Sequence, residues 1–465
     1  MGTVFDAWQF SQALSEVAWA TSAPPPLLQQ RQHQRLGQVL AAARAGSRLY
    51  ARRLRGLPDG PEALARLAPV DRHELMDRFA DWVTDPALVL DELRAFTADA
   101  DRIGEPFLGR YLVWESSGTS GTPGIFVQDA RCLALYDALE SLRRHPVRPL
   151  QRWLDPLCLG ERIAFVGATS GHFASYISVE RLRRLQPWLA PSIQCFSILE
   201  PLDRLVDSLN RFSPTVLASY PTAAALLGDE AQAGRLRLPS LREVWTGGET
   251  LGRTVRERVQ RQLGASVRNS YGASEFLAMA WECAQGHLHL NSDWVLLEPV
   301  DEHHRPVPAG EPSASVLLTH LGNTVQPLIR YDLGDQIVFS AQPCGCGSAL
   351  PVIEVQGRRD DTLQVAGRRG HRVALLPLAL STVLEEQAQL FDFQLCQRDD
   401  HTLLLRLPQR AAEGRQALAA ARRVLQAFAQ AQGAAPLKIL GELGVAVPRG
   451  RSGKACRILP RREGG

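Results

Sequence analysis

The chain has 465 residues, of which 45% are hydrophobic and 22% charged, a composition typical of a soluble globular protein of roughly two or three domains and too apolar for a disordered chain. Its 52 basic and 49 acidic residues leave a formal net charge of +3, which is too small to indicate a nucleic-acid partner. Only two of the basic residues are lysines, Lys438 and Lys454, and a compact ammonium group is not interchangeable with a guanidinium at a reacting atom.

Composition also bears on location. The N-terminal segment carries no basic stretch, and polar residues interrupt its apolar positions, unlike in a signal peptide. No apolar stretch approaches the roughly 20 residues that cross a bilayer. Eight cysteines are too few for a disulfide framework, so we expect a cytoplasmic protein that contacts no membrane and keeps its thiols reduced.

In chain order, the N-terminal region up to about residue 100 is predicted to be helical. Apolar positions recur at three-to-four spacing over 27–50, and a second helix is expected over 70–79 with Asp71 as its N-cap. From about 110 to 300, short apolar segments alternate with amphipathic ones. This alternation predicts an α/β core in which strands and helices follow one another around a mostly parallel sheet.

The rest of the chain has a different pattern. Residues 300–357 are rich in strands joined by Gly and Pro. Residues 360–465 have the order strand, helix, strand, strand, long helix, strand, and are numerous enough to fold separately. We therefore expect an α/β fold class, with a large N-terminal domain (1–359) of mostly parallel sheets and a β-rich subdomain, followed by a small, mobile α+β C-terminal domain (360–465).

The strongest local motif is SSGTSGTPG at 116–124, directly after the apolar YLVW. Its glycines allow backbone N–H groups to turn inward and its hydroxyls add donors, as a loop that holds phosphate oxygens requires. It is not a Walker loop, because no Gly-Lys-Ser/Thr follows. The alternative is a surface Ser/Gly linker. The candidate phosphate-binding residues are Ser117, Gly118, Thr119, Ser120 and Gly121.

Two further motifs follow short apolar strands, TGGE at 246–249 and NSYGASE at 269–275. Glycine-bearing turns at the ends of strands in an α/β sheet are where nucleotides usually bind. Tyr271 offers a ring face for a base, and Glu275 a hard oxygen ligand for Mg²⁺. The alternative for each turn alone is an ordinary strand-to-helix connection.

Three pieces nearer the C-terminus complete the set. In YDLGD at 331–335, Asp335 can accept both hydroxyls of a ribose, and Arg358 of GRRDD can supply donors. The segment RSGKACR at 451–457 is a Gly/Ser-containing loop that presents Lys454.

SSGTSGTPG, YGASE, YDLGD, GRRDD and SGKACR occur in the order, and at about the spacing, of the adenylate-forming acid–thiol ligase superfamily. The chain most resembles its phenylacetate–CoA ligase branch, which includes coenzyme F390 synthetase-like proteins. The resemblance implies ATP-dependent adenylation of a carboxylic acid, expected to be aromatic, to acyl-AMP with release of pyrophosphate, and then acyl transfer to the thiol of CoA. The alternatives are acyl transfer to the phosphopantetheine of a carrier protein or to an amine, and a degenerate zinc-bearing nucleotide-binding protein without turnover.

The resemblance also implies residue roles. The 116–124 loop would orient the triphosphate, Asp335 and Arg358 would bind the ribose, and Lys454 matches the lysine that the C-terminal lid domain inserts into the adenylation site. Ser274 and Glu275 would hold the phosphate and Mg²⁺. The residues that would frame adenine are Gly247, Gly248, Glu249, Asn269, Ser270, Tyr271 and Gly272. Asp360 falls at the hinge between the adenylation domain and the lid domain.

Two points are less regular. The phosphate loop often carries a lysine in this superfamily, whereas Thr122 and Gly124 occupy that stretch here, so we expect the phosphate grip to be weaker or differently supported. The segment ATSGHF resembles the border of the acyl pocket in this branch. Its His172 either contacts the substrate carboxylate as a catalytic residue or is a hydrogen-bonded structural histidine.

A metal site is predicted from Cys283, His289, Cys344 and Cys346. Two thiolates on a glycine-rich turn, with Cys and His from a nearby hairpin, would form a closed tetrahedral Cys₃His zinc site without a catalytic role. His287 is the alternative histidine ligand, and reduced structural cysteines are the alternative to any metal. The basic C-terminal tail is expected to contact the reaction site and the phosphates of CoA or an acidic carrier domain, and a homodimer is compatible with the sequence.

Overall fold

The structure is a computed structural model that describes residues 4–116, 123–143, 160–169, 171–368, 371–448 and 457–461. The N-terminal region is helical, as predicted. Ser47 divides the helix expected over 27–50, because its hydroxyl accepts the Tyr50 N–H and starts a new helix. Asp71 caps the helix after it, as predicted, by accepting the Glu74 N–H. The elements are α1 (Ala7–Ser22), α2 (Pro25–Gly46), α3 (Arg48–Arg53), α4 (Pro61–Arg66), α5 (Arg72–Asp77), α6 (Phe79–Trp82), α7 (Leu90–Ala98) and the 3₁₀ helix η1 (Ala100–Arg102).

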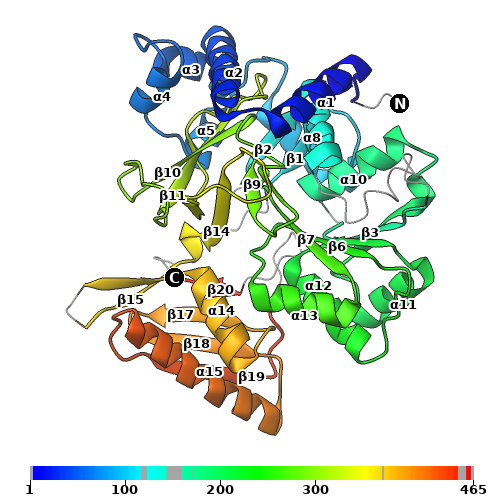
Figure 1. Ribbon diagram of the computed structural model, residues 1–465, viewed down its shortest axis with the longest axis vertical. Helices are drawn as coiled ribbons and strands as arrows, with labels where there is room; N and C mark the ends of the chain where they lie inside the picture. Colours follow the sequence, from blue (N-terminus) through cyan, green and yellow to red (C-terminus); the bar gives the residue numbers. More distant parts are fainter. Residues whose placement is uncertain are drawn as a thin grey trace.

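A nine-stranded sheet forms the centre of the molecule, in the order β13-β14-β9-β8-β7-β6-β5-β3-β4. One half is parallel and alternates with helices that pack beside it (Figure 1), as the sequence predicts. Its strands are β3 (Ile163–Gly167), β4 (Ile193–Ser197), β5 (Val216–Ser219), β6 (Glu243–Thr246) and β7 (Ser266–Tyr271). Its helices are α10 (Ala174–Leu185), η2 (Ala190–Ser192), α11 (Leu202–Phe212), α12 (Pro221–Gln232) and α13 (Arg253–Leu263).

The sheet changes direction at β7, which is parallel to β6 on one side and antiparallel to β8 on the other. The antiparallel half consists of β8 (Ala280–Glu282), β9 (Leu288–Leu290), β13 (Asp335–Phe339) and β14 (Val352–Arg358). A three-stranded sheet lies beside it, made of β10 (Val295–Val300), β11 (Ser315–His320) and β12 (Tyr331–Asp332). The hairpin β1 (Leu112–Glu115) and β2 (Ile125–Gln128) leads into α8 (Ala130–Arg143).

The C-terminal part has a hydrophobic core of its own, from Leu363 to Ile458, and lies below the rest of the molecule in Figure 1. The predicted elements occur in the predicted order, and the structure adds two strands that were not predicted: β16, before the first helix, and the short β20 at the end. The elements are η3 (Arg359–Asp361), β15 (Leu363–Ala366), β16 (Arg372–Leu375), α14 (Pro377–Ala388), β17 (Gln394–Asp399), β18 (Thr402–Leu407), α15 (Ala411–Ala431), β19 (Lys438–Leu443) and β20 (Ile458–Leu459).

The expected α/β fold class is confirmed, with a large mixed sheet in the N-terminal part and a smaller α+β C-terminal domain. The expectation of mostly parallel sheets in the N-terminal part holds for only half of the nine-stranded sheet, because β8, β9, β13 and β14 pair antiparallel. In the part of the chain that the structure describes, no helix is both long and apolar enough to cross a membrane.

Candidate active site

One cavity of about 2680 Å³ brings most of the predicted nucleotide-binding motifs together. It lies at the carboxyl ends of β6 and β7, where the turns after parallel strands meet at one edge of the sheet. β12, β13 and β14 border it on the antiparallel side, and residues of the C-terminal domain close it from below. The predicted site residues that line it are Gly248, Glu249, Asn269, Ser270, Tyr271, Gly272, Ser274, Glu275, Asp335 and Arg358.

Gly247 is not among the lining residues, but it allows a close approach between two of the motifs. A Cβ atom at this position would lie 3.0 Å from the Ser270 Oγ, so the absence of a side chain lets the TGGE turn pack on β7. Gly248, which follows, has φ +78°, a left-handed conformation that favours glycine. Both glycines of TGGE therefore have a steric reason to be glycine.

Two predicted elements of the site, Ser117–Gly121 and Lys454, fall outside the described residues. The base of the phosphate loop is described. The Ser116 N–H donates to the Gly124 carbonyl at 2.9 Å, and the Gly124 N–H donates to the Ser116 Oγ at 2.8 Å. Ser116 lines the cavity, and so does Arg457, three residues after Lys454. The first residue of the predicted phosphate loop and a residue just after Lys454 therefore line the same cavity.

Two buried carboxylates face the cavity, and each accepts a hydrogen bond from a tyrosine. The Tyr271 hydroxyl donates to Asp335 Oδ2 at 2.6 Å, and the Tyr331 hydroxyl donates to Glu275 Oε1 at 2.8 Å. Arg358 Nε lies 3.6 Å from Asp335 Oδ1. Burial raises the pKa of Glu275, while the Tyr331 hydrogen bond and the nearby Arg358 act in the opposite direction.

Glu249 joins the TGGE turn to the start of α12. Its carboxylate accepts the Thr222 backbone N–H and the Thr222 hydroxyl, each at 3.1 Å. This is the position at which an acidic side chain satisfies free N–H groups and the positive end of the helix dipole. Glu249 therefore connects the TGGE turn to α12 at the wall of the cavity. This structural role is additional to the predicted one of framing adenine.

His172 does not line the cavity and has a structural environment. It is 1% exposed, its Nε2–H donates to the Asp99 carbonyl at 2.9 Å, and its ring packs edge-on against Phe96. Its Nδ1 atom has no hydrogen-bond partner among the described residues. The geometry therefore favours the hydrogen-bonded structural histidine over the catalytic one.

The N-terminal helices contribute to the cavity although they carry no recognisable motif. Asp71, Arg72 and His73, at the start of α5, line it. The Arg72 side chain passes Gly124, where a Cβ atom would lie 3.2 Å from its Cδ. Sequence reasoning missed Arg72 because its approach to Gly124 is a long-range contact that no local pattern indicates.

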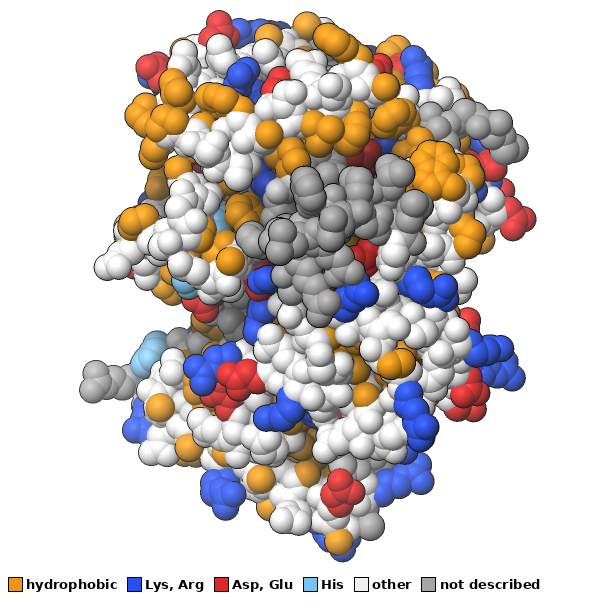
Figure 2. Space-filling view, turned by 45° about the vertical axis from the view of Figure 1, so that its right-hand side comes forward, with side chains coloured by type: hydrophobic (Ala, Val, Ile, Leu, Met, Phe, Trp, Pro, Cys, Tyr) orange, Lys and Arg blue, Asp and Glu red, His pale blue; other side chains and the backbone are white. Residues whose placement is uncertain are grey.

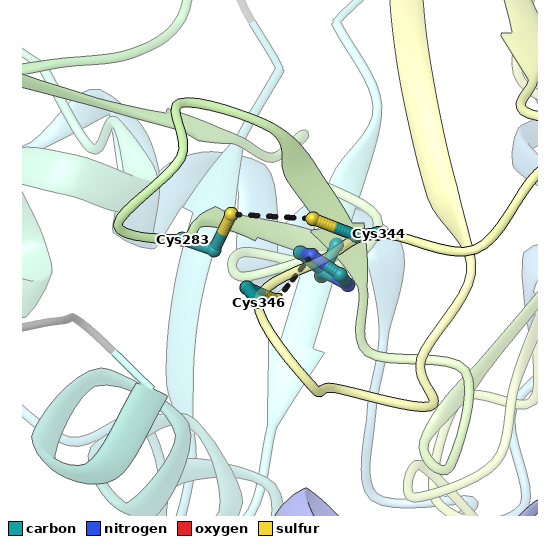
Figure 3. Close-up of side chains that lie close together, drawn as sticks. Cys283, Cys344 and Cys346 are labelled. Atoms are coloured by element: carbon teal, nitrogen blue, oxygen red, sulfur yellow. Dashed lines mark hydrogen bonds between the residues drawn. The ribbon is translucent and has the colours of Figure 1, made fainter.

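The predicted metal ligands lie together. Cys283 follows β8, His289 is on β9, and Cys344 and Cys346 belong to the turn between β13 and β14 (Figure 3). Cys283 Sγ lies 3.9 Å from Cys344 Sγ, and Cys346 Sγ lies 3.3 Å from His289 Nε2. One ligand atom from each of the four residues falls within 4.8 Å of the others, the compactness that a tetrahedral site requires.

His289 fits this cluster better than His287. Its Nδ1–H donates to the Leu350 carbonyl at 2.8 Å, so the other ring nitrogen, Nε2, is the one that faces Cys346. Trp281 stacks on its ring and fixes its orientation. His287 is exposed, and its Nδ1 lies 3.2 Å from the Cys344 Sγ. The donor set of three thiols and one oriented imidazole is of the kind that holds zinc.

Comparison with known proteins gives matches in sequence over part of the chain. Residues 193–316 match the AMP-binding enzyme family. A phenylacetate-coenzyme A ligase of Thermus thermophilus is 30% identical over 173 residues, which cover 36% of this chain and 39% of the relative. Protein CapK of Staphylococcus aureus is 24% identical over 168 residues, 36% of each chain. The matched segment thus spans less than two fifths of either relative.

Similarity in structure extends over nearly the whole chain. A crystal structure of 2-hydroxyisobutyryl-CoA ligase in the postadenylation state, in complex with R3-HIB-AMP, has a TM-score of 0.69 at 21% identity and covers 96% of this chain and 92% of its own. The same ligase with 2-HIB-AMP and CoA has a TM-score of 0.57. The resemblance inferred from the motifs is therefore confirmed: residues 193–316 match the AMP-binding enzyme family, and the chain has the fold of this acyl-CoA ligase.

Proposed function

We propose that this chain adenylates a carboxylic acid with ATP and transfers the acyl group to CoA. In the first step a carboxylate oxygen forms a bond to the α-phosphorus, and the bond between the α- and β-phosphates breaks to release pyrophosphate. In the second step the CoA thiol attacks the acyl carbon, and AMP leaves. The observation that carries the proposal is that turns from TGGE, NSYGASE, YDLGD and GRRDD surround one cavity between two domains.

The residues fit the charges of the first step. The acid and the triphosphate are both anionic, so the site must supply positive charge where the new bond forms. Glu275, whose carboxylate faces the cavity, would hold Mg²⁺, which when bound neutralises charge on the phosphates. Asp335 and Arg358 would hold the ribose, and Lys454 would bring an ammonium to the α-phosphate from the C-terminal domain.

The acceptor is proposed to be CoA because arginines of the C-terminal domain, alongside acidic residues such as Glu385 and Asp400, line the cavity. Figure 2 shows basic side chains on both sides of the junction between the upper and lower parts of the molecule. The arginines of the C-terminal domain that line the cavity are Arg372, Arg398, Arg406, Arg457 and Arg461. Guanidinium groups are suited to the phosphates of CoA. A carrier-protein phosphopantetheine and an amine are the alternative acceptors.

An aromatic acid is the proposed substrate. It is supported by the motif resemblance and by the 30% identity to a phenylacetate-coenzyme A ligase over 173 residues. The similar solved structure with a TM-score of 0.69 belongs to a ligase whose name states a small hydroxy acid, so short-chain acids belong in the same panel.

The first experiment is ATP–pyrophosphate exchange with a panel of aryl, short-chain and hydroxy acids. Exchange supported by at least one aryl acid, followed by thioester formation with CoA, is expected. If no acid supports exchange, the adenylation function is wrong and a nucleotide-binding protein without turnover remains. If exchange occurs but neither CoA nor phosphopantetheine is acylated, an amine acceptor replaces the thiol.

We further propose that Cys283, His289, Cys344 and Cys346 hold a structural zinc ion. Their ligand atoms lie within 4.8 Å of one another, and no position of a four-ligand site is left for a reacting water. The protein purified without chelator is expected to contain about one zinc per chain by elemental analysis. Cys346→Ser should lose most of the metal and lower the unfolding temperature, whereas Cys132→Ser, at a buried cysteine of α8, should keep it. Less than half a zinc per wild-type chain would contradict the proposal.

A further inference from the structure

In each of the two buried tyrosine–carboxylate pairs of the cavity, the tyrosine and the carboxylate come from different sequence motifs. Tyr271 belongs to NSYGASE, but its hydroxyl donates to Asp335 of YDLGD at 2.6 Å. Tyr331 belongs to YDLGD, but its hydroxyl donates to Glu275 of NSYGASE at 2.8 Å. Each motif therefore supplies one carboxylate to the cavity and one phenol that holds the carboxylate of the other motif.

We propose that Tyr271 and Tyr331 are positioning residues that fix the spacing between the ribose-binding and phosphate-binding carboxylates of the nucleotide site. The proposal rests on the proposed function, which assigns Asp335 to the ribose and Glu275 to the Mg²⁺–phosphate end. Neither tyrosine is required to touch the reacting atoms, because each acts through the carboxylate that it holds.

The environment of the pairs supports this role. Tyr271, Glu275, Tyr331 and Asp335 are each less than one tenth exposed, so little water competes for their hydrogen bonds. Burial and the neighbouring carboxylate raise the pKa of both phenols well above the usual value, so both keep the proton that they donate. A phenol on a rigid strand has few rotamers to lose, and its hydrogen bond fixes the direction of the carboxylate that accepts it.

The pairs also connect elements that are far apart in the sequence. Tyr271 ends β7, at the place where the large sheet changes from parallel to antiparallel, and Asp335 begins β13 at the edge of that sheet. Tyr331 is on β12, in the separate three-stranded sheet. The Tyr271–Asp335 hydrogen bond therefore connects the two halves of the large sheet, and the Tyr331–Glu275 hydrogen bond connects the small sheet to the turn after β7.

The first test measures AMP binding by titration calorimetry, which needs neither an acid substrate nor turnover. Tyr271→Phe removes only the hydroxyl, and the AMP dissociation constant is expected to rise about tenfold or more because a hydrogen bond to a charged group is lost. In the background of Asp335→Asn, the same substitution should add less than a twofold effect. A Tyr271→Phe variant that binds AMP within twofold of the wild type would overturn the proposal.

A matched control exists on the same molecule. The Tyr111 hydroxyl donates to Asp85 Oδ2 at 2.6 Å, and Tyr111 is buried like Tyr271, but neither partner lines the cavity. Tyr111→Phe should therefore leave AMP affinity unchanged. If it weakens AMP binding as much as Tyr271→Phe does, the effect is a general one of losing a buried phenol, and the positioning role is wrong.

Tyr331 is tested through the metal. The gain in ATP affinity that Mg²⁺ confers is measured by titrating ATP with and without the ion. Tyr331→Phe and Glu275→Gln are each expected to reduce this gain several-fold, and the double variant should lose no more than Glu275→Gln alone. A Tyr331→Phe variant with the full wild-type gain would contradict the role. If no acid supports exchange, the proposed adenylation function is wrong. The AMP and Mg²⁺–ATP binding measurements need no acid, so they would still test the roles of Tyr271 and Tyr331.

Discussion

Gly272 sits where the backbone of the nucleotide site has no room for a side chain. A Cβ atom there would lie 1.8 Å from the Leu277 carbonyl oxygen and 2.8 Å from its carbon. The turn between these residues carries Ser274 and Glu275, and its path is fixed from both sides. Trp114 Nε1 donates to the Ser274 carbonyl at 2.8 Å, and Phe276 is completely buried. The position of Glu275 in the cavity therefore depends on the backbone as well as on Tyr331.

Gly272→Ala is expected to displace this turn. Overpacking against backbone that cannot move costs about 1–3 kcal/mol of unfolding free energy, and the displaced Glu275 should weaken Mg²⁺–ATP binding at least tenfold. Denaturant unfolding and calorimetry measure the two effects. The control is Gly37→Ala in α2, where a Cβ atom would have no neighbour within 4 Å and a gain of up to about 1 kcal/mol is expected. Equal stability of the two variants would contradict the steric argument.

Residue types in the site were predictable, but their partners were not. Carboxylates near glycine-bearing turns led to Glu275 and Asp335, because carboxylates suit Mg²⁺ and ribose hydroxyls, whereas Glu249 was included on the family resemblance. The hydrogen bonds from Tyr331 to Glu275 and from Tyr271 to Asp335 span 56 and 64 positions, and they depend on strand register that local pattern does not contain. His172 was ambiguous for the same reason, since Asp99, which accepts its Nε2–H, is 73 residues away.

At the scale of elements, the alternation of apolar and amphipathic segments was sufficient for the parallel half of the sheet and for the C-terminal α+β order. Periodicity reports which face of a segment is buried, and this is enough where each strand pairs with a sequence neighbour or a βαβ partner. The switch at β7 was not predictable in this way. β8 and β9 follow β7 as sequence neighbours, but β14 crosses back to pair with β9, so the place of β13 and β14 in the large sheet depends on a long-range pairing.

Helix α14 of the C-terminal domain contacts both β14 and α13, and the two helices lie side by side in Figure 1. Gly252 caps α13 without a side chain, and Glu385 of α14 fills the space beside it, 2.9 Å from where a Cβ atom would be. Glu386 accepts the Thr254 hydroxyl at 3.3 Å. Acidic groups from the C-terminal domain thus lie at the positive end of an N-terminal-domain helix. Phe391, after α14, packs on the N-terminal-domain core beneath Arg258.

Phe391→Ala is expected to loosen this contact without unfolding either domain. The lost apolar burial and cation–π contact correspond to about 1.5–3 kcal/mol, a shift of tenfold or more in the docked population. Fluorescence energy transfer between unnatural labelled residues, one in each domain, would report a longer mean distance at an unchanged unfolding temperature. Phe428→Ala, at a residue packed against the C-terminal core, should lower the unfolding temperature and leave the mean distance between the labels unchanged. An unchanged distance distribution for Phe391→Ala would show that α13 and α14 do not hold the domains together.

At the scale of the whole molecule, the connection between the domains is tied to the nucleotide site. Arg358 and Arg359 lead from β14 into the C-terminal domain, and both contact YDLGD: Arg358 Nε lies 3.6 Å from Asp335 Oδ1, and Arg359 Nη1 lies 2.8 Å from Asp332 Oδ2. Near the other end of this domain in the sequence, Arg457 pairs with the buried Glu385 at 2.6 Å, and both residues line the same cavity. The chain thus enters this domain beside Asp335 and returns, after the segment that contains Lys454, at the interdomain contact, so we expect nucleotide binding and domain position to be coupled.

The two lysines of the chain allow the sharpest test of this connection. Lys454→Ala should lower ATP–pyrophosphate exchange by about 100-fold or more, because an ammonium at the α-phosphate stabilises charge that develops only in adenylation. Thioester formation from supplied acyl-AMP should change little, since that step uses a second domain position. Lys454→Arg should not restore exchange, because a planar guanidinium does not replace a compact ammonium. Lys438→Ala, at the exposed start of β19, should leave both half-reactions unchanged. Equal losses in the two half-reactions for Lys454→Ala would mean that the lysine serves the site as a whole rather than one position of a moving domain.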